Sequence, residues 1–200
     1  MNSVTIEFYT DFICPWCYIG KERMTKVVAS LKGQLDITLI PKPYLLYPTI
    51  PLGGIDKSVF AKKTKPGMGR SLRDEAAIEQ LELNYRKIER IPNSRLAHKL
   101  ISTLPDNELK WNRSLEIIRD YFQRGQNIED EQYLKAKLES NHNLHDTQYD
   151  DQLKEELEEA EELNISLVPT IRLNKAVVMP GLHTAEVWTR YIQRASVMKL

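Results

Sequence analysis

The chain has 200 residues, and its 28 basic and 28 acidic side chains give it a formal net charge of zero. This balance argues against a general nucleic-acid-binding protein, which needs a cationic surface. With 42% hydrophobic residues, a mean hydropathy of −0.45 and no apolar run near the ~20 residues of a membrane helix, we expect a soluble globular protein of one or two domains.

The first elements predict a parallel pair of strands. Residues 4–9 alternate in polarity and are rich in β-branched and aromatic side chains, which favours a strand. A helical pattern then runs from Trp16 or Cys17 to about residue 31, and residues 36–41 form a second strand pattern. A helix between two strands is a crossover, and crossovers join parallel strands. Residues 1–8 show no basic segment followed by a long apolar one, so we expect no signal peptide and a cytoplasmic location.

The middle of the chain predicts helices. Residues 57–73 hold six basic side chains and no acidic one, which indicates a solvated loop or a lid over an anionic partner such as glutathione. No strand pattern follows until residue 164. We expect helices over residues 71–90, from Asn93 or Ser94 onward, over 108–124 with Gly125 at the end, over 130–140 and over 146–163.

The last segment returns to strands. Residues 168–173 and 176–179 form strand patterns around a tight turn at Asn174-Lys175, and Thr184 can cap a final helix. The chain is therefore organised as βαβ, a helical block, and ββα.

The two cysteines of the chain form the motif Cys14-Pro15-Trp16-Cys17 between the first strand and the first helix. Unpaired N–H groups at a helix N-terminus stabilise a thiolate, which is the attacking form of cysteine. The spacing places Cys17 one helical turn after Cys14, so that Cys17 can attack a mixed disulfide at Cys14. We expect Cys14 to be an exposed nucleophile and Cys17 a more buried resolving thiol. Zinc needs four ligands, and the close histidine pair His142 and His145 lies far along the chain, so no metal site is predicted.

The segment Asp11-Phe12-Ile13-Cys14-Pro15-Trp16-Cys17-Tyr18-Ile19-Gly20-Lys21 resembles the active-site segment of DsbA-type thioredoxin-fold proteins, in particular the FrnE-like branch. Three further segments agree with it: Pro92-Asn93, Tyr121-Phe122 and residues 165–170. The resemblance implies an α/β, DsbA-like thioredoxin fold. Its thioredoxin-like domain comprises residues 1–56 and 165–200, and an all-helical insertion comprises residues 57–164.

The same resemblance implies a protein-disulfide oxidoreductase with Cys14 and Cys17 as the catalytic pair. It implies a cis-proline at Pro169 facing the cysteines, whereas the residues alone also allow an ordinary trans-proline that opens a strand. The expected substrate-binding residues are Pro15, Trp16, Val168, Pro169, Thr170 and Asn93, although Asn93 also suits a helix cap. The expected partners are thiols or disulfides of proteins or small molecules, with glutathione as a candidate co-substrate and no other cofactor, metal, nucleic acid or membrane.

Two other functions remain open at this point. A glutathione-dependent isomerase of the kappa-like type, similar to 2-hydroxychromene-2-carboxylate isomerase, shares this architecture but generally lacks a C-x-x-C pair. A non-catalytic holdase would instead use the helical insertion as a binding surface and would not need the cysteines.

Overall fold

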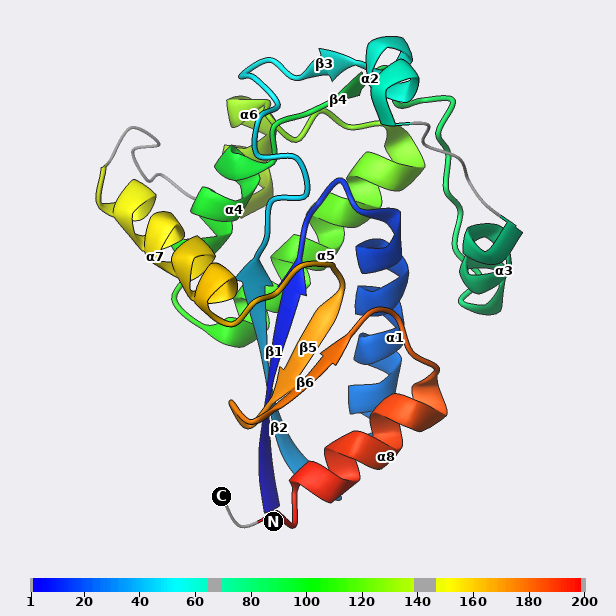
Figure 1. Cartoon of the computed structure of the whole chain (residues 1–200), viewed down its shortest axis with the longest axis vertical. Helices are drawn as coiled ribbons and strands as arrows, with labels where there is room; N and C mark the ends of the chain where they lie inside the picture. The colour runs from blue at the N-terminus through cyan, green and yellow to red at the C-terminus, as the bar shows by residue number, and fades with distance from the viewer. Residues whose placement is uncertain (1, 65–69, 139–146, 199–200) are drawn as a thin grey trace.

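The computed structural model describes residues 2–64, 70–138 and 147–198. Its central sheet has four strands in the order β2-β1-β5-β6 (Figure 1). The strands are β1 Asn2–Thr10, β2 Leu35–Pro43, β5 Thr170–Leu173 and β6 Val177–Pro180. β1 is parallel to β2 and antiparallel to β5, which pairs antiparallel with β6. The predicted βαβ and ββα segments are thereby confirmed and lie in one sheet.

The helices surround this sheet. In the described part of the chain they are α1 Pro15–Leu31, α2 Lys57–Thr64, α3 Arg70–Ile78, α4 Arg95–Ser102, α5 Asn107–Arg124, α6 Glu131–Leu138, α7 Gln148–Glu162 and α8 Ala185–Ala195. None of these helices is long and apolar enough to cross a membrane. The predicted ends of the helices at residues 130–140 and 146–163 fall partly outside the described residues, as do His142 and His145.

Local sequence signals explain where several helices begin and end. Thr184 is the N-cap of α8, and its hydroxyl accepts a hydrogen bond from the Val187 amide. Gly125 ends α5 with φ 69°, the left-handed conformation that glycine adopts without strain. In the β5–β6 hairpin, Asn174 and Lys175 both have positive φ, as a two-residue turn requires. These boundaries confirm the predictions from the sequence.

The two faces of the sheet differ in chemistry. Val4, Ile6 and Phe8 of β1 face an apolar core that contains Trp188 of α8 and also Trp111 of α5. Figure 1 shows α1 and α8 on one side of the sheet and α7 on the other. On the α7 side, Lys42 of β2 and Arg172 of β5 form ion pairs with Glu159 of α7, and Arg172 also pairs with Glu7 of β1. Through Trp111, α5 of the predicted insertion shares the apolar core of the sheet.

The prediction of one helix over residues 71–90 is wrong for the residues that follow α3. α3 ends at Ile78, and Gln80 has φ 59° while the Leu81 amide bonds to the Ala76 carbonyl, a helix-ending arrangement. The chain then runs as a non-helical segment whose Asn84 amide donates to the Phe122 carbonyl. Its apolar residues follow a helical spacing, but they pack against α5 and the active-site end instead of forming a helix.

Two further predictions about the middle segment are wrong. Residues 57–64 form α2 instead of a loop, while residues 65–69 lie outside the described part. Two short strands, β3 Ile55–Asp56 and β4 Arg90–Ile91, pair antiparallel, so the block predicted as helical contains a strand. Arg90 donates to the carbonyls of Gly53 and Gly54, which holds this pair together. Two-residue strands are too short to produce an alternating pattern.

Candidate active site

The turn between β1 and α1 places both cysteines at a helix N-terminus. Cys14 is the N-cap of α1 with extended backbone angles, and Pro15 occupies the first helical turn, where its missing N–H costs little. The Cys17 amide lies 3.4 Å from Cys14 Sγ and donates to it. The Cys14 sulfur therefore receives an N–H of the helix start, the environment that stabilises a thiolate.

Asp11 holds this turn in place from a fully buried position. Its carboxylate accepts the Leu46 amide at 2.7 Å and the Ile13 amide at 3.4 Å, and its backbone carbonyl accepts the Cys14 amide at 3.1 Å. His98 Nε2 lies 3.7 Å from Asp11 Oδ1. One carboxylate thus ties the cysteine turn to the segment after β2.

The Val168–Pro169 loop faces the cysteines from the C-terminal part of the chain. Its peptide bond is cis, as expected from the resemblance. Cys14 Sγ lies 3.6 Å from the Val168 carbonyl oxygen and donates to it, across 154 residues of sequence. Thr170 Oγ1 donates to the Leu167 carbonyl at 2.7 Å, which braces the loop. The structure therefore brings Cys14, Val168 and Pro169 together.

Gly20 allows this approach. A Cβ at this position of α1 would lie 3.2 Å from Pro169 Cγ and 3.1 Å from the Phe8 ring. Both neighbours are held in place, since Phe8 is a fully buried core residue. A side chain at position 20 would require the Phe8 ring and Pro169 to shift by a few tenths of an ångström.

Both sulfurs are buried free thiols. Cys14 is 2% exposed and Cys17 is fully buried, so the expected exposure of Cys14 is wrong. The Val168 loop and the Cys17 amide contact the Cys14 sulfur directly, which the sequence does not reveal. Burial raises the pKa of the Cys17 thiol well above its ordinary value, and the nearby Cys14 raises it further. Cys17 is therefore a protonated thiol at neutral pH.

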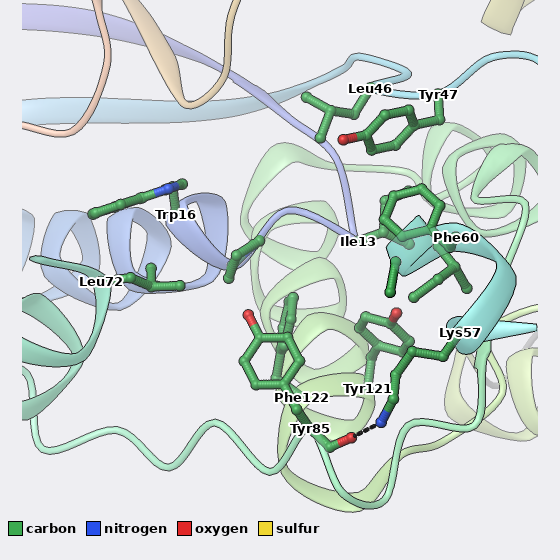
Figure 2. A pocket seen from close by; sticks show the side chains of 13 residues that line it. Ile13, Trp16, Leu46, Tyr47, Lys57, Phe60, Leu72, Tyr85, Tyr121 and Phe122 are labelled. Atoms are coloured by element: carbon green, nitrogen blue, oxygen red, sulfur yellow. Dashed lines mark hydrogen bonds between the residues drawn. The ribbon is translucent and has the colours of Figure 1, made fainter. Parts of the chain in front are cut away.

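An apolar cavity of about 360 Å³ opens beside the motif (Figure 2). Pro15 and Trp16 line it, as their predicted substrate-binding role requires. The other lining residues come from the loops after β1 and β2, from α2 and α3, from the segment after α3, from β4 and from α5: Ile13, Leu46, Tyr47, Lys57, Phe60, Ala61, Leu72, Tyr85, Ile91, Tyr121 and Phe122. Most of them are apolar or aromatic, so the cavity suits an apolar group near the sulfurs.

Several of these cavity residues were not predicted as site residues from the sequence. Tyr121 and Phe122 follow a helical spacing that indicates only a core face. Tyr85 lines the cavity together with Pro15 and Trp16 of the motif. Burial raises the pKa of Tyr85, and the charge of Cys14 acts in the same direction. Lys57 donates to the Tyr85 carbonyl (Figure 2). No local motif marks Tyr85 or Lys57.

Asn93 does not line this cavity. Its amide nitrogen donates to the Ile50 carbonyl at 2.6 Å, and its amide oxygen accepts the Arg95 amide at 3.0 Å. These bonds fix the start of α4, where Ser94 is the N-cap residue and makes no side-chain cap bond. Substrate binding by Asn93 stays a prediction, and its observed bonds match the helix-start alternative.

Metal ligation has no support within residues 2–64, 70–138 and 147–198. There, no group of three or more histidine, cysteine, aspartate or glutamate side chains gathers in a way that could hold an ion. The cysteine pair stands beside apolar and aromatic groups instead.

With this geometry in place, comparison with known proteins decides the family. The model of the DSBA-like thioredoxin domain matches residues 5–193. The chain belongs to the DsbA-like thioredoxin family. The match spans both predicted parts of the thioredoxin-like domain and the helical block between them, which confirms the expected fold class.

Individual relatives of this DsbA-like chain agree in fold. The protein YwbO of Bacillus subtilis, itself uncharacterized, is 25% identical over 95% of this chain and 96% of its own length. The structure of a probable DsbA oxidoreductase from Streptomyces coelicolor superposes with a TM-score of 0.80 at 20% identity, over 98% of this chain and 92% of that one.

Two more distant structures have other named activities. A 2-hydroxychromene-2-carboxylate isomerase has a TM-score of 0.66 at 16% identity, covering 95% of this chain and 93% of its own. The cytosolic disulfide reductase DsbM from Pseudomonas aeruginosa, with GSH, has a TM-score of 0.60 at 14% identity, covering 95% and 98%. At these identities the likeness concerns the fold, so the activity of this DsbA-like chain has to be argued from its own site.

Proposed function

We propose that the protein is a thiol–disulfide oxidoreductase that cycles Cys14 and Cys17 between dithiol and disulfide. The observation that carries this proposal is the position of Cys14: its sulfur caps α1 and lies 3.6 Å from the Val168 carbonyl oxygen beside the cis-proline. Membership in a family whose members are named oxidoreductases supports it.

In the reducing direction, the Cys14 thiolate attacks a substrate disulfide. A Cys14–substrate disulfide forms, and the substrate's other sulfur leaves with the electron pair of the broken bond. Cys17 then attacks Cys14 Sγ, which releases the second substrate sulfur as a thiolate and leaves a Cys14–Cys17 disulfide. The substrate gains two electrons and the protein loses two. The reverse sequence oxidises a dithiol, and the relative reduction potentials set the direction.

The cavity favours substrates with an apolar or aromatic group near the sulfur. Its walls are mostly aromatic and aliphatic, with Trp16 next to the cysteines and Tyr121 and Phe122 on α5 (Figure 2). Glutathione is a candidate co-substrate that returns the protein to the dithiol, and the related DsbM structure contains GSH. We further propose that the chain belongs to the FrnE-like branch, on the motif around Cys14. We also propose that it acts in the cytoplasm, which agrees with the name of the cytosolic DsbM.

Turnover of a disulfide by defined variants tests this function. We expect the wild-type protein, with glutathione as reductant, to reduce a peptide disulfide flanked by aromatic residues. Cys14→Ser should lose the activity completely, because no nucleophile remains. Cys17→Ser should accumulate a mixed disulfide with the substrate on Cys14, visible by mass spectrometry. Full activity in Cys14→Ser would refute the proposal.

The same variants separate the other functions. Conversion of a chromene carboxylate in the presence of glutathione that survives Cys17→Ser would indicate an isomerase. Protection of an unfolded client by the double variant Cys14→Ser/Cys17→Ser, without redox turnover in the wild type, would indicate a holdase.

A further inference from the structure

Lys21 is a fully buried lysine without a hydrogen-bond partner in the part of the chain that the structure describes. Its ammonium nitrogen lies over the Trp111 ring, 3.7 Å from the ring centroid, and 5.5 Å from that of Phe8. Burial of an unpaired lysine is costly, and such groups shift toward the neutral amine or serve a function. The fold therefore keeps an amine in its apolar core beside the active-site helix.

The amine lies on the same side of α1 as the resolving cysteine. Lys21 follows Cys17 by four residues, and side chains at this spacing are neighbours on a helix. The charge of Cys17 acts on Lys21 in the direction that favours the ammonium form. Both side chains are fully buried, so water does not screen this interaction.

The other charged groups around Lys21 are engaged elsewhere or exposed. On β1, Glu7 pairs with Arg172 at 3.3 Å. The neighbours of Lys21 on α1 also have partners. Glu22 pairs with Arg119 of α5 at 2.7 Å, and Arg23 pairs with one glutamate of α3 and with another just after that helix. The exposed charged residues of the packed helices are Glu108 and Arg124 on α5 and Glu186, Arg190 and Arg194 on α8. Glu116 and Asp120 of α5 have ion-pair partners in Arg113, Arg124 and Lys137. Among the described residues, Cys17 is the titratable group whose charge acts on Lys21.

Burial shifts the pKa values of the two groups in opposite directions, so a neutral amine and a protonated thiol coexist near neutral pH. Burial lowers the pKa of Lys21 to about 7, and the charge of Cys17 opposes this lowering. The Cys17 thiol, with its raised pKa, does not ionise unaided at neutral pH. Transfer of the Cys17 thiol proton to the Lys21 amine produces an ammonium beside a thiolate without changing the net charge. The apolar core therefore does not acquire an unpaired charge.

We propose that Lys21 is the proton acceptor for Cys17 in the resolving step, an assignment that rests on the proposed function. As Cys17 attacks the mixed disulfide, its thiol proton passes to the Lys21 amine and its sulfur forms the bond to Cys14 Sγ. The bond between Cys14 and the substrate sulfur breaks, and the substrate leaves as a thiolate with that electron pair. The Lys21 ammonium then releases its proton to water. In the reverse direction the ammonium returns the proton to Cys17 as the disulfide opens.

The reaction with 5,5′-dithiobis(2-nitrobenzoate) separates the two steps. Attack by Cys14 releases one coloured thiolate in a phase that depends on reagent concentration. Attack by Cys17 on the resulting mixed disulfide releases the second in a phase that does not. Stopped-flow absorbance at high reagent concentration, between pH 5 and 9, measures both rates in the reduced wild type and in Lys21→Met, which keeps the side-chain length without the amine.

We expect Lys21→Met to leave the first phase unchanged and to slow the second at least about tenfold at pH 7, in line with the usual effect of general acid–base catalysis. In the wild type the second phase should slow as the pH falls through about 7, because the protonated amine cannot accept a proton. In the variant this dependence should move to higher pH, where Cys17 ionises by itself. Lys32→Met is the matched control, since Lys32 is the exposed residue that follows the same helix, and both phases should be unchanged.

Equal second phases in wild type and Lys21→Met would overturn the role of Lys21. Equal slowing of both phases would also overturn it, because that result marks a purely structural effect. If Lys21→Met does not fold, the wild-type pH profile decides, and a second phase that is constant from pH 5 to 9 refutes the assignment. Absence of the first phase in the wild type would instead refute the proposed function itself.

Discussion

At the scale of single residues, the active site depends on how closely α1 approaches the Pro169 loop. Gly20 provides the space, since a Cβ there would lie 3.2 Å from Pro169 Cγ and 3.1 Å from Phe8. The motif residues Cys14 and Cys17 supply the chemistry, while Gly20 sets the distance at which the loop meets them.

Gly20→Val should lower the free energy of unfolding by about 1–3 kcal/mol, the usual cost of overpacking a core. It should also slow the reaction of Cys14, because the Val168 carbonyl that now contacts the sulfur is displaced. Urea denaturation and the rate of disulfide exchange measure the two effects. Ala29→Val, at an exposed position of the same helix, is the control and should cost only a few tenths of a kcal/mol. If Gly20→Val had the stability and the disulfide-exchange rate of the wild type, this would contradict a tight approach of α1 to the Pro169 loop.

The buried amine of Lys21 gives stability a pH dependence of its own. Its pKa is lowered to about 7 in the folded protein, whereas an unfolded lysine stays protonated to about pH 10. Between pH 7 and 9 the unfolded chain therefore binds more protons at this site, and stability rises with pH. Urea denaturation at both values should show a larger gain for the wild type than for Lys21→Met. A parallel pH dependence in the two proteins would mean that Lys21 stays charged in the fold.

At the scale of elements, a buried ion-pair cluster attaches α3 to the active-site helix. Arg23 of α1 contacts Glu79 at 2.6 Å and Glu75 at 2.5 Å, and it also donates to the His183 carbonyl at 2.8 Å. Lys26 contacts the same Glu79 at 2.8 Å. α3 supplies Leu72 to the cavity, so this cluster positions one wall of the substrate site.

Arg23→Met should cost about 3 kcal/mol, because it leaves Glu79 buried with Lys26 alone. Burial raises the pKa of Glu79, but hydrogen bonds from Lys26 and Arg23 outweigh that effect and lower it. This contribution to stability is therefore present above the ordinary glutamate pKa and is lost as the pH falls below it. Thermal unfolding at pH 7 and pH 3.5 measures both effects. Arg124→Met, which removes a surface pair with Asp120, should cost less than 1 kcal/mol, and an equal cost for the two variants would contradict the buried role of Arg23.

Elements with local start and stop signals were predictable from the sequence. Pro15 at the start of α1, Gly125 after α5 and Thr184 before α8 act through their own backbone or side chain, and the structure confirms each. Residues 79–90 were not predictable, because their apolar spacing fits a helix while tertiary contacts, such as Asn84 with Phe122, hold them in a non-helical path.

The candidate site also contains some residues that were predictable from the sequence and others that were not. The cysteine pair and Pro169 carry a recognisable motif and a family resemblance, so they could be found from the chain alone. The burial of Cys14, the wall formed by Tyr85 and the isolation of Lys21 result from segments far apart in sequence. No local pattern encodes such contacts, and they appear only in the folded chain.

At the scale of the whole molecule, the helical block and the sheet share one core. Trp111 of α5 lies among core residues of β1 and α8, with its ring 5.3 Å from that of Phe8, and its indole N–H donates to Thr25 of α1 at 3.0 Å. The predicted boundary at residues 57–164 thus separates chain segments that pack together, so we expect them to unfold together.

Trp111→Ala should destabilise the protein by about 3–5 kcal/mol, the usual cost of emptying a large core site. The helical signal in circular dichroism and the fluorescence of the two remaining tryptophans, Trp16 and Trp188, should still change in one transition, because both parts depend on the same core. Trp16→Ala, at a half-buried position of the cavity wall, is the control and should cost less. Two separate transitions in the wild type would contradict the shared core.

The central claim is that Cys14 and Cys17 form a reversible redox pair. Equilibration in buffers of defined reduced-to-oxidised glutathione ratio, followed by thiol alkylation and mass spectrometry, tests it most directly. We expect a reversible change between the dithiol and an intramolecular Cys14–Cys17 disulfide, with the same midpoint from either direction. Persistence of two free thiols in fully oxidised glutathione, or a lasting glutathione adduct on Cys14 that Cys17 never displaces, would contradict it.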